Sequence, residues 1–352
     1  MKRRILCPLA ALSLAIAFAC ANDPEPEGEG SAAVPDAAVE APDAAVDVDA
    51  AVDMDAASGD GADASHDGEA PDAGPIDGGE SDAGAAPETG GSGGSGGLSC
   101  RTTKSVTTNG GVKLSYCMTR VAESELKVVE PTGVAGPLTL AIYLHGDGAR
   151  PHVNDTALRH QGDWVAENGV LYVSALAPNN CSWWRAPLPA IGSCDSETAY
   201  DNNPQDTEGK NADALREIIE AMRAAYDIDD RRVLLGGSSG GAIMLTASFI
   251  PRHGDRYPAA YALACGGEVP WQEFAWDTSD SDLVGGISLS FAYGTGERLT
   301  SEITDAHEFY EALGVHSEVR VETPTSYEYN HCHYNQLSTI PDQWDSAPAL
   351  AE

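Results

Sequence analysis

The most constraining stretch of this sequence is residues 233–249, where a short apolar run, a cluster of small residues and a second apolar run follow one another. Residues 233–235 predict a fully buried strand, and residues 242–249 predict a buried helix. Between them, Gly236-Gly237-Ser238-Ser239-Gly240 matches G-x-S-x-G, the pattern of a sharp strand-to-helix turn that lifts a serine clear of a sheet. Small residues two positions on either side of the serine prevent collisions between the strand and the helix.

The pattern alone is weak, because it fits this sequence in more than one place. Two further matches lie in residues 90–97, with no strand before them and no helix after them. A frame shifted by one residue fits as well and makes Ser239 the exposed serine. We predict Ser238 as the nucleophile, because this frame puts Gly236 directly at the strand end. A phosphate-binding loop would carry a Lys after the glycines, where this chain has Ala-Ile.

The first 19 residues predict an export signal. Lys2, Arg3 and Arg4 precede an apolar stretch over residues 5–19 that is too short to be a spanning helix. Cleavage before Cys20 would leave a cysteine that can be lipidated, as in bacterial lipoproteins, whereas the simpler alternative is an ordinary signal peptide. We therefore expect an exported protein that is lipid-anchored to the cell envelope or outer surface through Cys20, and otherwise secreted.

Residues 20–97 predict a disordered linker. Between positions 21 and 99 the chain has 13 Asp and seven Glu but no Lys or Arg, and it turns Gly-rich at residues 90–97. Isolated Val, Ile and Met side chains cannot form a core that offsets the entropy of ordering. The segment is best interpreted as a tether, extended by its own charge. Calcium binding by its Asp repeats is a remote alternative, because the spacing of a known calcium loop is missing.

Residues 98–352 are long enough for one α/β domain with a large core. The formal charge of the whole chain is −35. This acidic balance argues against nucleic acid and anionic lipid as partners. We expect a monomer that contacts a membrane only through a lipid at Cys20.

Six cysteines fall in this region, and an even number in an exported chain predicts three disulfides. The sequence does not fix their pairing. Cys100 and Cys117 bracket a predicted hairpin, and Cys181 with Cys194 would close a short loop; this leaves Cys265 with Cys332. Apart from His331-Cys332-His333, no Cys/His cluster with zinc spacing is present, and in an extended segment those two histidines would point to opposite sides. We therefore predict no metal and no cofactor.

Strand and helix signals alternate along residues 98–352. The predicted strands are 102–108, 112–120, 125–130, 138–144, 170–176, 233–235, 259–264, 287–293 and 315–322. The predicted helices are 155–168, 206–226, 242–249 and 302–313. This order predicts an α/β fold, a mainly parallel sheet covered by helices on both faces, with an N-terminal antiparallel hairpin at Asn109-Gly110. Residues 268–285 are expected to form a long loop, and the C-terminal tail has no strong signal. In such sheets the chemistry lies at the carboxyl ends of the strands.

A serine becomes a nucleophile when a base takes its proton and a third group orients that base. In the fold that carries a G-x-S-x-G turn, the acid and then the histidine follow the serine along the chain. Glu297, in Tyr-Gly-Thr-Gly-Glu after the strand 287–293, is the predicted acid, and Asp305 is the fallback. His331 and His333 follow the last strand; either can be the base, and we favour His331.

The reaction also needs backbone N–H groups that face the developing oxyanion. We predict the N–H groups of Ser239 and Asp147 in this role. Asp147 lies in His145-Gly146-Asp147-Gly148, directly after the strand 138–144. A tight turn without catalytic meaning is the alternative for this loop.

These segments resemble a known family. They look like the polyhydroxybutyrate depolymerase and feruloyl or acetylxylan esterase branch of the α/β hydrolases. The residues that carry this resemblance are Asp227-Ile228-Asp229, Arg232-Val233, 236–241, His145-Gly146 and 293–297. The resemblance spans roughly residues 138–334 and is specific around the serine turn. A Cys-Trp-x-Trp-like stretch of that branch corresponds here to Cys181-Ser182-Trp183-Trp184, which implies an aromatic wall for the substrate; a core role is the alternative for Trp183 and Trp184. Glu297 in place of Asp, and Asn330-His331-Cys332 in place of Gly-His, depart from the pattern.

The combined expectation is a secreted serine esterase that hydrolyses carboxylic esters, either of a polyester or of acyl and feruloyl groups on polysaccharide, through Ser238, His331 and Glu297. One alternative is an exported serine peptidase of the same fold, although the large gating domain usual in such enzymes is missing from this sequence. The other is a non-catalytic binding domain on a hydrolase scaffold, which would not be labelled by a fluorophosphonate.

Overall fold

A computed structural model describes residues 97–134, 136–187, 204–323 and 331–347. The chain divides into two units, Met1–Asp82 and Ala83–Glu352, and all described residues belong to the second. The predicted export signal, Cys20, nearly all of the predicted linker, and Cys194 lie outside the described residues.

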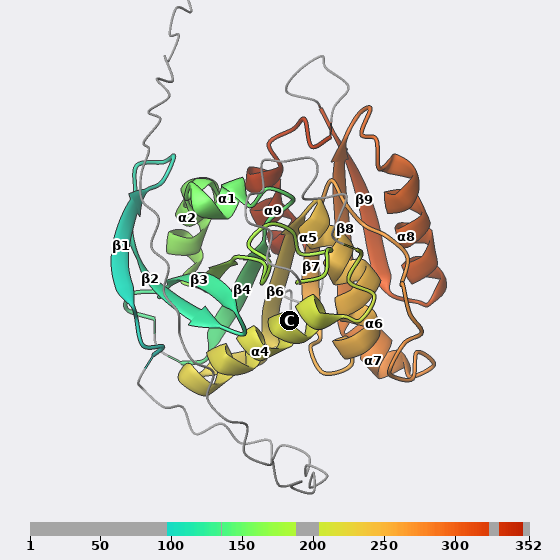
Figure 1. The fold of residues 1–352 in the computed structure, drawn as a ribbon, viewed down its shortest axis with the longest axis horizontal. Coiled ribbons are helices and arrows are strands. Elements are labelled where there is room, and N and C mark those ends of the chain that lie inside the picture. The colour runs from blue at the N-terminus through green and yellow to red at the C-terminus, as the bar shows by residue number, and fades with distance from the viewer. Residues whose placement is uncertain (1–96, 135, 188–203, 324–330, 348–352) are drawn as a thin grey trace, which may run out of the picture. The chain divides into compact units, whose positions relative to one another are not determined.

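Within the described residues, nine strands form one sheet in the order β1-β2-β3-β5-β4-β6-β7-β8-β9 (Figure 1). The strands are β1 (Thr102–Thr107), β2 (Lys113–Val121), β3 (Ser124–Val129), β4 (Leu138–Leu144), β5 (Leu171–Ala175), β6 (Ile228–Ser238), β7 (Ala259–Ala264), β8 (Ile287–Gly294) and β9 (His316–Glu322). The pairs β1–β2, β2–β3 and β3–β5 are antiparallel, and all later pairs are parallel. This confirms the predicted fold class, because a parallel sheet follows an antiparallel N-terminal edge.

Helices cover both faces of this sheet. They are α1 (Arg150–Val153), α2 (Thr156–Asn168), α4 (Lys210–Ala225), α5 (Gly240–Met244), the π-helical η1 (Leu245–Phe249), α6 (Ile250–His253), α7 (Ser281–Gly285), α8 (Thr300–Ala312) and α9 (Gln336–Asp345). Side chains of α4, α5, η1 and α8 belong to the core on one face, and side chains of α2 and α9 belong to the core on the other. No helix among the described residues combines the length and the apolar character needed to cross a membrane.

Alternation along the central strands separates these two cores. On β4, Leu140, Ile142 and Leu144 belong to the same core as side chains of α4 and α8, whereas Ala141 and Tyr143 belong to the core that includes α2 and α9. Successive strand residues point to opposite faces, so β4 is buried on both sides. A run that is apolar at every position except Thr139 therefore predicted this strand with its observed ends.

The N-terminal hairpin forms as predicted, with Thr107 paired to Lys113 across the turn and Cys100 bonded to Cys117. Helix α2 also ends as predicted, at Gly169 with φ of 60°. Asp155 does not cap this helix through its side chain. Its carboxylate instead accepts hydrogen bonds from Lys127 Nζ at 2.6 Å and from Tyr116 Oη at 3.1 Å.

Three helices were missed from the sequence, namely the one-turn helix α1, α7 and α9. The short helix α7 lies at the end of the predicted loop 268–285 and is capped by Asp280, whose carboxylate accepts from the backbone N–H groups of Asp282 and Leu283. Helix α9 lies in the tail, buries Leu337, Ile340 and Trp344, and contains Pro341. The apolar spacing in α9 is helical, but an internal proline weakened that signal.

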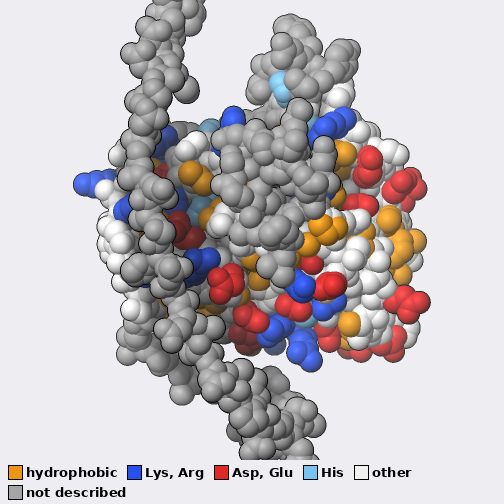
Figure 2. Space-filling view, viewed as in Figure 1, with side chains coloured by type: hydrophobic (Ala, Val, Ile, Leu, Met, Phe, Trp, Pro, Cys, Tyr) orange, Lys and Arg blue, Asp and Glu red, His pale blue; other side chains and the backbone are white. Residues whose placement is uncertain are grey.

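Figure 2 shows acidic and basic side chains intermixed on the face viewed.

Candidate active site

The strand-to-helix turn between β6 and α5 is the centre of the site. Ser239, at the turn, has φ of 49° and ψ of −116°, outside the regions that non-glycine residues ordinarily occupy. Such a conformation costs about 1–3 kcal/mol and is typical of functional turns. A Cβ on Gly237 would lie 2.6 Å from the backbone N of Ala242, and one on Gly241 would lie 2.5 Å from the carbonyl O of Leu144. Glycine is therefore required two positions before and two positions after Ser239.

The structure corrects the predicted frame, because Ser238 is not the serine that faces the histidine. Strand β6 continues to Ser238, which pairs with Ala264 of β7. The Ser238 hydroxyl is buried and accepts a hydrogen bond from Tyr143 Oη at 3.1 Å. Burial raises the pKa of the Tyr143 phenol, which keeps this donor protonated. The predicted strand ended at residue 235, whereas β6 extends to Ser238. The predicted nucleophile therefore lies one residue before the serine of the observed turn.

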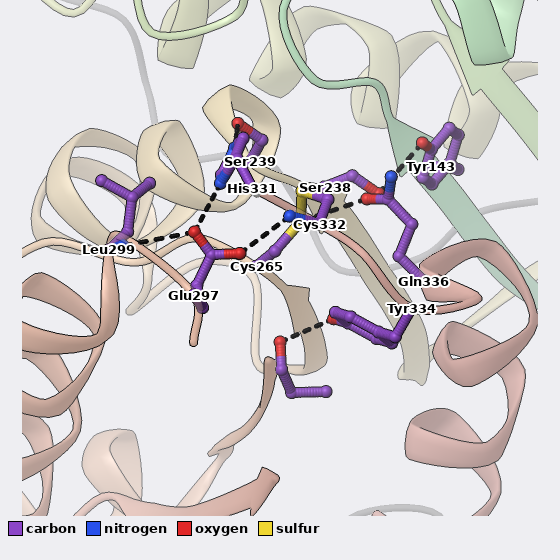
Figure 3. Close-up of a disulfide and its surroundings, with 11 residues drawn as sticks. Tyr143, Ser238, Ser239, Cys265, Glu297, Leu299, His331, Cys332, Tyr334 and Gln336 are labelled. Carbon is purple, nitrogen blue, oxygen red and sulfur yellow. Dashed lines mark hydrogen bonds and ion pairs between the residues drawn. A yellow bond between two sulfur atoms is a disulfide. The ribbon is translucent and has the colours of Figure 1, made fainter. Parts of the chain in front are cut away.

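Ser239, His331 and Glu297 form one hydrogen-bonded chain (Figure 3). Ser239 Oγ lies 2.5 Å from His331 Nε2, and His331 Nδ1 lies 2.6 Å from Glu297 Oε1. A carboxylate only accepts, so it places the imidazole proton on Nδ1 and leaves Nε2 to accept the serine proton. The Glu297 side chain is 0% exposed and that of His331 is 21% exposed. The carboxylate end of the chain is thus buried, whereas His331 and Ser239 are both partly exposed.

Glu297 lies in the turn after β8 and is surrounded by donors. Oε1 also accepts from the Leu299 N–H at 3.2 Å, and Oε2 accepts from the Cys332 N–H at 2.8 Å. Burial raises the pKa of this carboxyl, but the hydrogen bonds from His331 and from the backbone outweigh it, and the net pKa is lowered. Glu297 is therefore held as a carboxylate.

A disulfide fixes the loop that carries His331. Cys332 is bonded to Cys265, as predicted, and Cys265 follows β7 directly. Strand β7 pairs with β6, which leads into Ser239. The bond therefore connects the residue after the imidazole to the strand beside the serine turn, and Figure 3 shows it next to Glu297.

The loop after β4 lies against the serine turn, as expected. A Cβ on Gly146 would lie 3.1 Å from Ser239 Cβ. The Gly146 carbonyl accepts from His145 Nδ1 at 2.6 Å and from the Ala149 N–H at 3.3 Å. Burial lowers the pKa of His145 to about 3, although its hydrogen bond to Gly146 partly opposes this shift. His145 is therefore a neutral side chain that orients the 146–147 peptide.

One predicted oxyanion donor is corrected. The Ser239 N–H donates to the carbonyl of Ala264 at 2.8 Å, so it completes the β6–β7 ladder and does not face the site. The N–H after Ser239 belongs to Gly240, the first residue of α5, which has no intrahelical acceptor. Hydrogen bonds from His145 and Ala149 fix the Gly146 carbonyl. The Asp147 N–H belongs to the same trans peptide, so it is fixed in the opposite direction. Gly240 was missed because the frame was shifted.

The two tryptophans after Cys181 have different places. Trp183 is fully buried in the core, and its indole N–H donates to the Ala175 carbonyl at 3.3 Å, so it is not a substrate wall. Trp184 is half-buried. It lies beside the site, since a Cβ added to Gly240 would be 2.5 Å from Trp184 Cδ1. The Arg185 guanidinium lies 4.2 Å from the Trp184 ring centroid.

The two fallback residues lie outside the hydrogen-bonded chain of Ser239, His331 and Glu297. Asp305 is exposed on α8, as expected for a surface residue, and His333 is half-buried two residues after His331. Among the described residues, one group could in principle hold a metal ion, namely Cys265, Glu297, His331 and Cys332. Both sulfur atoms in this group are joined in the disulfide, and His331 Nδ1 is engaged by Glu297. These residues therefore do not offer thiolate ligands.

No protein-family model and no curated protein matches the sequence. Solved structures with a similar fold include a thermostable esterase, the Bacillus cereus carboxylesterase and the apoenzyme of S-formylglutathione hydrolase from Staphylococcus aureus. Identities are 17%, 16% and 12%, with TM-scores of 0.41, 0.43 and 0.42. The matches cover 69%, 63% and 70% of this chain, and 59%, 93% and 99% of those chains. At such identity the likeness concerns the fold and not the chemistry of the site.

Proposed function

We propose that this protein is a serine hydrolase that cleaves carboxylic esters through a covalent acyl-enzyme on Ser239. The single observation that carries this proposal is the hydrogen-bonded chain from Ser239 through His331 to Glu297, which begins at a strained turn at the end of β6. A nucleophile, a base within hydrogen-bond reach and a group that orients the base are the components of nucleophilic acyl transfer.

In the first half-reaction, Ser239 Oγ attacks the ester carbonyl carbon while His331 Nε2 takes the hydroxyl proton. Glu297 keeps the Nδ1 proton in place and stabilises the imidazolium that forms. The carbonyl oxygen becomes an oxyanion, and the N–H groups of Gly240 and Asp147 donate to it. The C–O bond to the leaving alcohol then breaks, and His331 returns its proton to that oxygen.

In the second half-reaction, a water molecule gives its proton to His331 and attacks the acyl carbon. The tetrahedral intermediate uses the same two N–H groups. Its collapse breaks the bond to Ser239 Oγ, which takes the proton back from His331, and releases the carboxylic acid. The residues supply every proton transfer in this cycle.

The cellular setting is part of the proposal. The N-terminal signal, a cysteine at position 20 and the acidic linker support an exported enzyme that is lipid-anchored or otherwise secreted. A tethered enzyme at a surface fits an ester that is part of a polymer, either a polyester or acyl and feruloyl groups on polysaccharide. Trp184, half-buried beside the turn, is the candidate contact for an apolar part of such a substrate.

Two neighbouring substitutions test the nucleophile. The purified full chain should hydrolyse p-nitrophenyl butyrate and be labelled by a fluorophosphonate. Ser239→Ala should abolish labelling and lower kcat by about 10⁴-fold or more. Ser238→Ala is the matched control, since its hydroxyl contacts Tyr143 instead of His331; it should lose about 1 kcal/mol of stability and retain labelling.

The alternatives give different outcomes in the same experiment. A folded protein that neither turns over an ester panel nor reacts with the fluorophosphonate would contradict the proposal and favour a binding domain. Cleavage of casein or peptide amides at rates above those for esters would favour a peptidase.

A further inference from the structure

The side chain of Asp147 makes contacts that the proposed chemistry does not use. Its Oδ1 accepts from Ser182 Oγ at 2.7 Å and from Trp184 Nε1 at 2.9 Å, and its Oδ2 lies 3.1 Å from the same indole nitrogen. Both donors come from the loop after β5, whereas Asp147 belongs to the loop after β4. The carboxylate therefore ties together two loops at the carboxyl edge of the sheet.

The donor loop is itself held in place. The buried Asn179 accepts from the Cys181 and Ser182 N–H groups at 2.9 and 2.8 Å. The buried Asn211 of α4 donates to the Trp183 and Arg185 carbonyls, both at 2.7 Å. The Gly148 N–H also donates to the Cys181 carbonyl at 3.1 Å. The loop that carries Ser182 and Trp184 is thus held by several hydrogen bonds, and its two side-chain donors fix the position of the Asp147 carboxylate.

That position is next to the reacting serine. A Cβ on Gly240 would lie 2.6 Å from Asp147 Oδ1 and 2.5 Å from Trp184 Cδ1. The carboxylate and the indole therefore pack against the Cα of the residue that follows Ser239. The same two residues, Asp147 and Gly240, carry the N–H groups that the proposed function assigns to the oxyanion.

We propose that the Asp147 carboxylate is a positioning group for the oxyanion hole, and that Ser182 and Trp184 hold it there. This inference rests on the proposed function. By fixing its own residue to the loop after β5 and packing against Gly240, the carboxylate sets the separation of the two N–H donors. Loss of the side chain would leave both N–H groups in the chain but let the donors move apart. The reaction would then lose transition-state binding while substrate binding changed little.

The test compares substitutions that keep or remove the acceptor. Asp147→Ala should lower kcat by about 10- to 100-fold, which is less than the loss of a whole oxyanion donor, and change KM by less than about threefold. Asp147→Asn keeps an oxygen acceptor for Ser182 and Trp184, so it should recover most of the lost kcat. Ser182→Ala and Trp184→Phe each remove one donor and should fall in between.

A trifluoromethyl ketone analogue of the substrate gives a readout that a merely structural role would not move. This inhibitor forms a tetrahedral oxyanion on the serine, so its affinity should fall in proportion to kcat/KM across the four variants. Asp345→Ala is the matched control, because Asp345 accepts from Trp164 Nε1 at 2.8 Å in an exposed pair between α9 and α2. It should leave kcat, KM and inhibitor affinity unchanged.

The outcomes separate this inference from the proposed function. If Asp147→Ala and Trp184→Phe match the wild-type kcat and inhibitor affinity, the positioning role is refuted while the serine hydrolase proposal stands. If the wild-type protein itself forms no adduct with the ketone and hydrolyses no ester, the proposed function fails first. Should Asp147→Ala not fold, the folded Trp184→Phe and Ser182→Ala variants decide by the same two measurements.

Discussion

Removal of the Cys265–Cys332 disulfide should abolish most of the activity of a protein that still folds. Cys332 follows His331 directly, and its N–H donates to Glu297 at 2.8 Å. The bond therefore holds the imidazole and one donor to the carboxylate in a single fixed turn. The perturbation is the double substitution Cys265→Ala with Cys332→Ala, and Cys100→Ala with Cys117→Ala is the control that opens the other described disulfide.

The sequence separations give the expected stability losses. Cys265 and Cys332 are 67 residues apart, which corresponds to about 4 kcal/mol of loop-closure entropy, and Cys100 and Cys117 are 17 apart, which corresponds to about 3 kcal/mol. For a domain of this size, each kcal/mol shifts Tm by about 2–4 °C. The two variants should therefore be destabilised to similar extents. Any difference in activity between them must come from the site.

The assay is p-nitrophenyl butyrate hydrolysis at about 15 °C, with the folded fraction followed by circular dichroism. A misplacement of about 1 Å near the reacting atoms costs about 100-fold in rate, so the Cys265/Cys332 variant should lose at least that in kcat. The Cys100/Cys117 variant should keep its kcat, because that disulfide joins β2 to Cys100, two residues before β1. A folded Cys265/Cys332 variant with wild-type kcat would refute the reasoning.

Two further predictions follow from the turn and from the acid. Gly237→Ala places a Cβ 2.6 Å from the backbone of Gly241 and Ala242, so it should lower the free energy of unfolding by about 1–3 kcal/mol and lower kcat at least about tenfold. Gly285→Ala is the control, because the space around its Cβ is open, and it should change neither stability nor kcat. Equal Tm values for the two variants would contradict this account of the turn. The folded-state pKa of Glu297 is lowered, so its ionised form contributes stability above its unfolded pKa of about 4.3, and that contribution is lost as the pH falls through the folded-state pKa. Glu297→Gln should therefore flatten the decline of Tm between about pH 5 and pH 3 measured by differential scanning fluorimetry, and an unchanged decline would contradict the assignment.

Local pattern predicted the central strands well, because they are buried on both faces and read as continuous apolar runs. The predicted limits of β4 and β7 are those observed. Helix α9 was missed although Leu337, Ile340 and Trp344 have helical spacing, because Pro341 interrupts the pattern. Trp183 was a candidate substrate wall because the stretch 181–184 resembles an aromatic stretch of a known family, but its side chain is fully buried in the core.

The sequence by itself determined that a serine would lie on a glycine-flanked turn at the end of a buried strand, with an acid and a histidine later in the chain. It could not decide between Ser238 and Ser239, because glycines flank both frames. The tertiary structure decided this, since the β6–β7 ladder continues through Ser238 and the alternation of a strand then directs that side chain to Tyr143 beneath the sheet edge. Ser239 is the first residue after β6, and only the packed loops bring His331 and Glu297 to it from 92 and 58 positions further along the chain.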